Sequence, residues 1–119
     1  MLILNKADRI VGEISYFKGM DYQVGYEVGY QIYLKSDRGK GYMSEALEIF
    51  SAYLFKLKPI TRLQLNLIKN NIGSRKVAER CGYKHEGTMR RAVFNRGKYH
   101  DLELFSLLKE EVESGLFEV

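Results

Sequence analysis

Hydrophobic and polar positions alternate along the first part of the chain with the two-residue period of β-strands. Short apolar-rich runs at residues 2–4 and 10–17 flank the polar segment 5–9, which predicts a hairpin. After a loop at residues 18–23, residues 24–34 are rich in β-branched and aromatic types and predict a third strand. Its alternation places two sets of side chains on opposite faces: Val28, Tyr30, Ile32 and Leu34 against Glu27, Gly29, Gln31 and Tyr33.

From Met43 the apolar residues recur every three or four positions, which predicts an amphipathic helix that stops near Pro59. Residues 62–68 alternate again and predict a strand. A shorter helix follows, opened by residues 70–74 and terminated by Gly82.

Two further strands, at residues 83–94 and 99–108, flank a hairpin turn, and the tail after Lys109 is expected to begin as a helix. The predicted order is therefore β-β-β-α-β-α-β-β. Hairpins at both ends and helical crossovers between them indicate an α/β (α+β) fold with a mixed, mostly antiparallel sheet, whose faces the two central helices cover. We find no linker or internal repeat, so residues 1–119 are expected to form a single domain.

Composition narrows the protein class. Hydrophobic residues make up 45% of the chain, as in a globular protein. The single cysteine, Cys81, cannot form an internal disulfide, and no apolar run approaches the roughly 20 residues of a membrane span. We therefore expect a cytoplasmic protein without membrane attachment. The net charge of +4 is more typical of ordinary surface chemistry than of nucleic-acid binding.

The most informative motif is the turn Arg38-Gly39-Lys40-Gly41-Tyr42-Met43, which runs into the first predicted helix. Glycines allow a ligand to approach the backbone, and a helix start presents unpaired N–H groups and partial positive charge. Together these features suit a phosphate group. The motif matches neither the Walker A loop nor the dinucleotide fingerprint, and by itself it is equally compatible with an ordinary strand–helix turn.

Three segments, in order, resemble the GNAT superfamily of N-acetyltransferases, in its RimJ/RimL-like (ribosomal-protein N-acetyltransferase) branch. Residues 26–30 leading into 38–47 are similar to the family's fourth strand, glycine loop and following helix. Residues 71–83 are similar to its Asn-x-x-Ser helix and Gly-aromatic exit. Residues 86–90 through 101–105 are similar to the C-terminal hairpin of the RimJ/RimL-like branch.

The resemblance implies an acetyl-CoA site. The backbone of residues 38–43 would hold the pyrophosphate, and exposed backbone of Ile32, Tyr33 and Leu34 would pair with pantetheine where two strands splay apart. The side chains of Arg38 and Lys40 would add charge, or be solvated surface cations. Asn71 and Ser74 would contact the CoA arm, or only cap the helix. The implied cofactor-binding residues are Ile32, Tyr33, Leu34, Arg38, Gly39, Lys40, Gly41, Tyr42, Met43, Asn71 and Ser74.

Glu27 is the candidate general base, because it lies on the strand that lines the family's cleft, among aromatic residues that could raise its pKa. A salt-bridged or exposed glutamate is the alternative. The family's usual tyrosine acid corresponds here to Ala78, so Tyr83, Tyr33 or water would replace it. His85 and His100 lack metal-ligand spacing, and no metal is expected.

The family usually has a strand and one or two helices before the segment that begins here at Met1. Without those elements, the strand at residues 2–4 would be an uncovered edge of the sheet. This favours a homodimer, in which a second copy covers the edge, over a truncated or weakly active form. The sequence as a whole predicts an acetyl-CoA-dependent transferase that acetylates a primary amine, such as a protein N-terminus, a polyamine or another small amine. The alternative is a truncated CoA-binding domain with little or no turnover.

Overall fold

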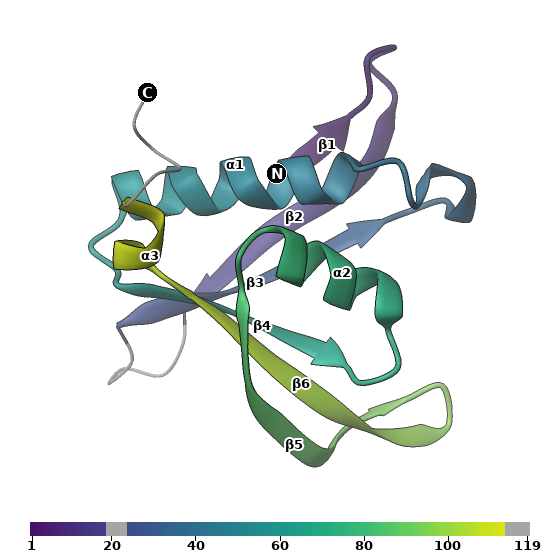
Figure 1. Ribbon diagram of the computed structural model, residues 1–119. Coiled ribbons are helices and arrows are strands. Elements are labelled where there is room, and N and C mark those ends of the chain that lie inside the picture. Colours follow the sequence, from purple (N-terminus) through teal and green to yellow (C-terminus); the bar gives the residue numbers. More distant parts are fainter. Residues whose placement is uncertain (19–23, 114–119) are drawn as a thin grey trace.

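A computed structural model describes residues 1–18 and 24–113 (Figure 1). The described elements are β1 Leu2–Leu4, β2 Ile10–Lys18, β3 Gly25–Ile32, the 3-10 turn η1 Lys35–Asp37, α1 Tyr42–Leu57, β4 Arg62–Ile68, α2 Ile72–Arg80, β5 Lys84–Asn95, β6 Lys98–Leu108 and α3 Lys109–Glu113. This succession confirms the predicted order of strands and helices, and adds η1. The expected loop at residues 19–23 and the tail beyond residue 113 lie outside the described residues.

The strands form one six-stranded sheet in the order β1-β2-β3-β4-β6-β5. Among the described pairs, β3 and β4 run parallel and the other neighbours run antiparallel. The mixed, mostly antiparallel sheet is therefore confirmed. The parallel pair follows from the crossover through α1, because a helix must carry the chain back to the start of the next strand.

Both central helices cover the same face of the sheet, which corrects the expectation that they cover its two faces (Figure 1). The Cys81 thiol donates to the Ser44 carbonyl oxygen at 3.2 Å, and the hydroxyls of Ser51 and Tyr83 lie 2.7 Å apart, so α1 packs directly beside the end of α2. The reason lies in the strands. Their apolar side chains, such as Leu63 of β4, are buried toward the helices and form one core.

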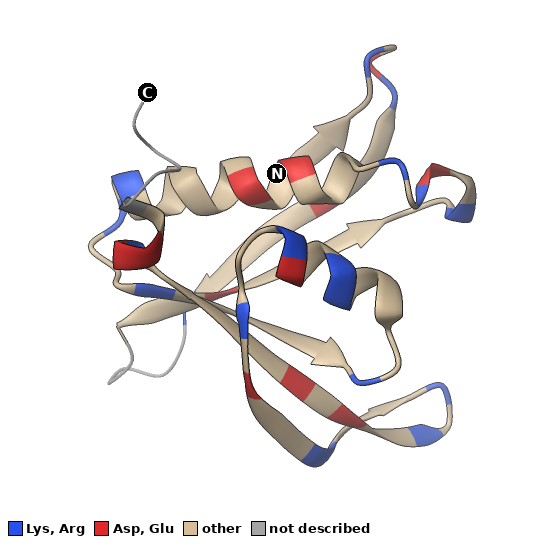
Figure 2. Cartoon of the chain, viewed as in Figure 1, with Lys and Arg blue, Asp and Glu red and all other residues tan. Residues whose placement is uncertain are grey.

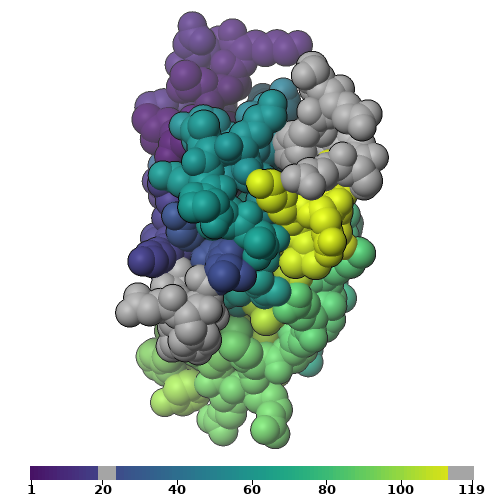
Figure 3. Space-filling model, turned by 90° about the vertical axis from the view of Figure 1, so that its left-hand side faces the viewer, coloured from purple at the N-terminus to yellow at the C-terminus, as the bar shows by residue number. Residues whose placement is uncertain are grey.

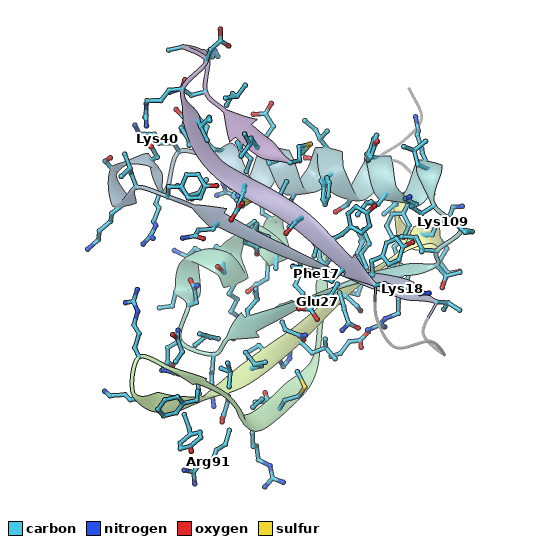
Figure 4. The ribbon with its side chains drawn as sticks, turned by 180° about the vertical axis from the view of Figure 1, so that it is seen from behind. Phe17, Lys18, Glu27, Lys40, Arg91 and Lys109 are labelled. Atoms are coloured by element: carbon cyan, nitrogen blue, oxygen red, sulfur yellow. The ribbon has the colours of Figure 1, made fainter. Side chains whose placement is uncertain are left out.

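The opposite face of the sheet is more polar. Glu27, Gln64 and Ser106 share one face, because residues paired in register point the same way and Glu27 pairs with Gln64, which pairs with Ser106. No helix of the described part of the chain covers this face (Figure 4). Within the same ranges, none of the helices is long and apolar enough to cross a membrane.

The third strand ends earlier than the sequence predicts. β3 stops at Ile32 rather than Leu34, because the Leu34 carbonyl oxygen accepts a hydrogen bond from the Asp37 amide at 3.0 Å. The chain thus turns through η1 before it reaches the glycine turn. Alternation within the strand is as predicted: Val28 is buried and Tyr30 and Ile32 pack against the core.

Candidate functional site

The two parallel strands separate after a short ladder. β3 pairs with β4 only from Gly25–Glu27 to Arg62–Gln64, although β3 continues to Ile32 and β4 to Ile68. Beyond Glu27 the edge of β3 that faces β4 has no strand partner. This is the separation of two strands that the resemblance implied. It leaves a gap in the sheet between the second half of β3 and the second half of β4.

The backbone of β3 divides its hydrogen-bonding groups between its two edges. The Tyr33 amide donates to the Val11 carbonyl oxygen at 2.9 Å, so Tyr33 faces β2. Because successive residues of an antiparallel pair face opposite edges, Tyr30 and Ile32 face the gap. Ile32 is thus placed as expected. The Tyr33 amide and the Leu34 carbonyl are already hydrogen-bonded within the chain, and the pairing of Tyr33 and Leu34 with pantetheine stays a prediction.

A groove of about 480 Å³ lies next to this gap, between β3, the glycine turn and α2. Eight of the predicted cofactor residues line it: Ile32, Arg38, Gly39, Gly41, Tyr42, Met43, Asn71 and Ser74. Tyr33, Leu34 and Lys40 do not. The groove also has walls that the sequence did not indicate: Tyr30, Gln31, Asp37, Ser44, Gly73, Lys76, Val77 and Arg80.

The glycine turn has the conformation that its sequence requires. Gly39 and Gly41 adopt φ values of 75° and 84°, in the left-handed region that favours glycine. A Cβ added to either glycine would meet no atom within 4 Å, so open space adjoins the backbone. Gly41 is also the N-cap of α1 and supplies no capping side chain. The first-turn amides of α1 are therefore free of a side-chain cap at the groove, an arrangement that suits an anion.

Two elements are tied together across the groove. The Tyr30 hydroxyl donates to the Ser74 carbonyl oxygen at 3.0 Å, and burial raises the Tyr30 pKa above its usual value. Asn71 caps α2, because its Oδ1 accepts from the Ser74 amide at 3.1 Å. The capping role of Asn71 is thus confirmed, and its contact with a ligand stays a prediction.

Positive side chains line the groove from two sides. Arg38 comes from the glycine turn, and Lys76 and Arg80 come from α2, which carries both of them on one side because they are four residues apart. Figure 2 shows basic positions, in blue, on α2 and in the segment before α1. The sequence did not single out the two α2 residues, since the direction in which a helix faces depends on its packing.

A buried carboxylate supports the glycine turn. The Asp37 side chain is 2% exposed and accepts two hydrogen bonds from the Arg9 guanidinium, at 3.0 and 2.7 Å. Arg9 also lowers the Asp37 pKa. The Lys40 ammonium lies 3.9 Å from the same carboxylate, so the Lys40 side chain pairs with Asp37 instead of lining the groove. Nothing local in the sequence joins Arg9 to Asp37, which are 28 residues apart.

Glu27 lies at the closed end of the gap, where the β3–β4 ladder ends. It is half-buried, and the Asn66 Nδ2 donates to its Oε1 at 2.8 Å. Burial raises the Glu27 pKa, although the hydrogen bond from Asn66 opposes the shift. Figure 4 shows Glu27 beside Phe17, its neighbour in register on β2. Within residues 1–18 and 24–113 the partner of Glu27 is a neutral amide, and no ion pair supports the salt-bridged alternative.

These features are those of a known family. A family model described as "Acetyltransferase (GNAT) domain" matches residues 1–84. The chain belongs to this family.

Individual GNAT relatives agree in sequence and fold. The "Putative ribosomal N-acetyltransferase YdaF" of Bacillus subtilis (strain 168) is 37% identical over 87 residues, which cover 73% of this chain and 47% of that protein. A crystal structure titled as a probable acetyltransferase is 33% identical with a TM-score of 0.81, covering 87% of this chain and 57% of the other. RimL, a ribosomal alpha-N-protein acetyltransferase crystallised in complex with coenzyme A, shares the fold at 24% identity and a TM-score of 0.79, covering 87% of this chain and 58% of RimL. The chain thus spans about half the length of the relatives it matches.

None of the three positions that the sequence linked to a tyrosine general acid, Ala78, Tyr83 and Tyr33, places a phenol in the groove. Ala78 is fully buried in the core. Tyr83 is also buried, hydrogen-bonded to Ser51 and absent from the groove lining, and burial raises its pKa. Tyr33 does not line the groove either. The sequence-based suggestion of Tyr83 or Tyr33 as a proton donor therefore has no support in the geometry.

The two histidines and the cysteine of the chain contact other protein groups and do not line the groove. His85 bonds to the Glu103 carboxylate, and the His100 ring lies 3.1 Å from the Asn95 carbonyl oxygen. Over residues 1–18 and 24–113, no group of three or more His, Cys, Asp or Glu could hold a metal ion. Cys81 is a buried core residue, and burial raises the pKa of its thiol to about 11.

Proposed function

We propose that this GNAT chain is an acetyl-CoA-dependent N-acetyltransferase that transfers acetyl directly to a primary amine. The observation that carries the proposal is the separation of β3 and β4. It joins an anion-suited groove beside Tyr30 and Ile32 to a half-buried carboxylate, Glu27, at the end of the same gap.

The groove fits the chemistry of coenzyme A. The pyrophosphate would lie on the turn from Arg38 to Met43, where the left-handed glycines and the uncapped start of α1 leave amides available. Lys76 and Arg80 would add positive charge. Pantetheine amides would pair with the free edge of β3 at Ile32, as a ligand adds to the edge of a sheet. RimL, which has the same fold, holds coenzyme A in its crystal structure.

The reaction needs only a few protein groups, because a thioester is already activated. An ammonium group entering the gap would lose one proton to the Glu27 carboxylate. The neutral amine nitrogen would then form a bond to the carbonyl carbon of the thioester, and the carbon–sulfur bond would break. The second amine proton would reach the leaving thiolate through water. The pKa of Glu27 is raised, which brings it closer to neutrality and suits a general base.

The acceptor is a primary amine on a protein N-terminus, a polyamine or another small molecule. The similarity to YdaF, which is described as a putative ribosomal N-acetyltransferase, favours a protein acceptor. We place the protein in the cytoplasm, because the one cysteine of the chain is a buried thiol that needs no oxidising compartment.

A homodimer is part of the proposal. β1 is an edge strand of the sheet, and Figure 3 shows the N-terminal segment, in purple, at one end of the molecule. The side chains of Leu2 and Leu4 on β1 are 56% and 53% exposed. An edge with exposed leucines is a template for pairing, which a second copy of the chain would cover. Sedimentation at micromolar concentration should give a dimer, and a clean monomer would contradict this part of the proposal.

The transferase proposal is tested in two steps. Calorimetry should show acetyl-CoA binding to the purified chain. A thiol-release assay with N-terminal peptides, polyamines and small amines should then show amine-dependent release of coenzyme A. Binding without any amine-dependent release would indicate a CoA-binding domain instead, and absence of binding would reject the groove assignment.

A further inference from the structure

One side-chain hydrogen bond crosses the start of the gap between β3 and β4. We propose that Asn66 is a positioning residue that holds the Glu27 carboxylate in the orientation in which it receives the proton of the acceptor amine. This inference rests on the role of Glu27 in the proposed function, and it concerns a residue that does not itself touch the thioester.

The position of Asn66 follows from the register of the two strands. Glu27 pairs with Gln64 in the last step of the β3–β4 ladder. Asn66 is the next residue of β4 on the same face, because side chains alternate along a strand. There the two backbones are no longer paired, and the 2.8 Å bond between the side chains takes over the link between the strands.

The hydrogen bond from the Asn66 amide to Glu27 favours one charge state of the carboxyl group. An amide N–H can only donate and an ionised carboxylate can only accept, so the bond favours ionised Glu27. It leaves the Asn66 Oδ1 buried without a hydrogen-bond partner among the described residues. In the described part of the chain, Glu27 is therefore the hydrogen-bond partner that orients the Asn66 amide.

The charged groups on neighbouring strands do not contact the Glu27 carboxylate in the described part of the chain. Arg62 of β4 binds Glu86 of β5 at 3.0 Å, and Glu86 also accepts from the Ser106 hydroxyl. Lys18 of β2 pairs in register with Tyr26, whereas Phe17 pairs with Glu27, so the Lys18 side chain lies on the opposite face of the sheet from Glu27. Burial and the Asn66 bond are the two causes that set the Glu27 pKa, so Asn66 is the polar contact that counters burial.

A purely structural role is the competing explanation. In that case Asn66 would only fasten the two strands, and its loss would lower thermal stability or acetyl-CoA affinity and leave the titration of Glu27 unchanged. The pKa of the Glu27 carboxyl therefore separates the two explanations.

The experiment uses the full chain with Asn66→Leu, and Gln64→Leu as the matched control. Gln64 lies on the same face of β4, but its side chain bonds to Arg62. The carboxyl of Glu27 is titrated by carbon-detected NMR in the absence of acetyl-CoA. We expect Asn66→Leu to raise the Glu27 pKa by about one unit, and Gln64→Leu to change it much less. The acid limb of the pH–rate profile should move to higher pH by the same amount.

The outcomes are distinct. An unchanged Glu27 pKa in a folded Asn66 variant overturns the inference, whatever happens to stability. If Asn66→Leu does not fold, Asn66→Ala removes the amide without added bulk and is judged by the same titration. A raised pKa with an unshifted rate profile would leave the Asn66–Glu27 link intact and reject Glu27 as the base, so a failure of the proposed function remains recognisable.

Discussion

Arg9 holds Asp37 through two hydrogen bonds, of 3.0 and 2.7 Å, and so connects the turn between β1 and β2 with the turn that precedes α1. The carboxylate of Asp37 lines the groove that we assign to a polyanionic ligand. An uncompensated negative charge there would repel the ligand. Arg9 therefore makes an acidic side chain compatible with an anion site.

The first prediction concerns this ion pair. Arg9→Met keeps most of the side-chain length and removes the charge, and we expect it to weaken acetyl-CoA binding by about tenfold. Asp37→Asn added to Arg9→Met should recover part of the affinity, because the repulsive charge is then gone. Calorimetry on the two variants measures both effects. An additive loss in the double variant would contradict the explanation by charge.

The pair also predicts a pH dependence of stability. The pKa of Asp37 lies below its usual 3.8, so the ionised form is stabilised in the folded protein. This stabilisation is fully present above pH 3.8 and disappears as the pH falls through the lower folded-state value. Thermal unfolding should show wild type more stable than Arg9→Met at pH 7, with the difference shrinking in strong acid. A constant difference at all pH values would argue against the pair as its source.

The second prediction tests the glycine turn. Gly41→Ala places a side chain at φ 84° and should lower the free energy of unfolding by about 1 kcal/mol. The added methyl group and the strain should also reduce acetyl-CoA affinity by about tenfold. Gly97→Ala is the matched control, since Gly97 has φ 75° and similar open space but lies in the turn between β5 and β6. Equal affinity in the two variants would reject the assignment of the turn to the ligand.

The third prediction concerns the base. Glu27→Gln removes the proton acceptor, and we expect a loss of about 100-fold or more in turnover. The factor should be largest at the lower end of the active pH range, where the free amine is scarce, and smaller at high pH. An unaltered pH–rate profile would remove Glu27 from the mechanism.

Stability supplies the control for that variant. The Glu27 pKa is raised in the folded state, so the folded protein is stabilised by protonation of this residue. Its ionisation opposes folding as the pH rises from 4.5 through the folded-state value. Glu27→Gln should therefore unfold at the same or a higher temperature than wild type at pH 7. A large drop in the unfolding temperature would mean that lost activity reflects misfolding.

The fourth prediction concerns α2. Lys76→Ala should weaken acetyl-CoA binding by about threefold to tenfold, with a smaller effect at high salt, because the groove is exposed to solvent. Arg75→Ala is the control on the same helix. Its side chain binds Glu79 at 3.0 Å and does not line the groove. Equal losses in the two variants would show only a general effect of the charge of α2.

Much of the site was predictable because its parts are local. Glycines that need a positive φ, an asparagine that caps a helix and a helix start with unpaired amides are all encoded within a few residues. The local conformation of the turn from Gly39 to Met43 and the cap at Asn71 were therefore predicted correctly, and their contact with a ligand stays a prediction. The end of β3 at Ile32 was not predicted, because it depends on a turn that the periodicity does not register.

The partners of Glu27 and Asp37 could not be predicted, since Asn66 lies 39 residues from Glu27 along the chain and Arg9 lies 28 from Asp37. Each bond exists because two separate elements pack side by side. The positions of Lys76 and Arg80 in the groove could not be predicted either. They depend on how α2 packs, with Ala78 buried against the core.

The sequence by itself determined the order of strands and helices, the glycine turn and the helix cap, because hydrophobic period and backbone preference act over a few neighbouring residues. Only the tertiary structure decided that β3 and β4 part after Glu27, that both helices share one face, and that Asn66 reaches Glu27 across the gap. Those features depend on pairing and packing between distant segments, whose energies are shared by the whole sheet and belong to no single stretch of the chain.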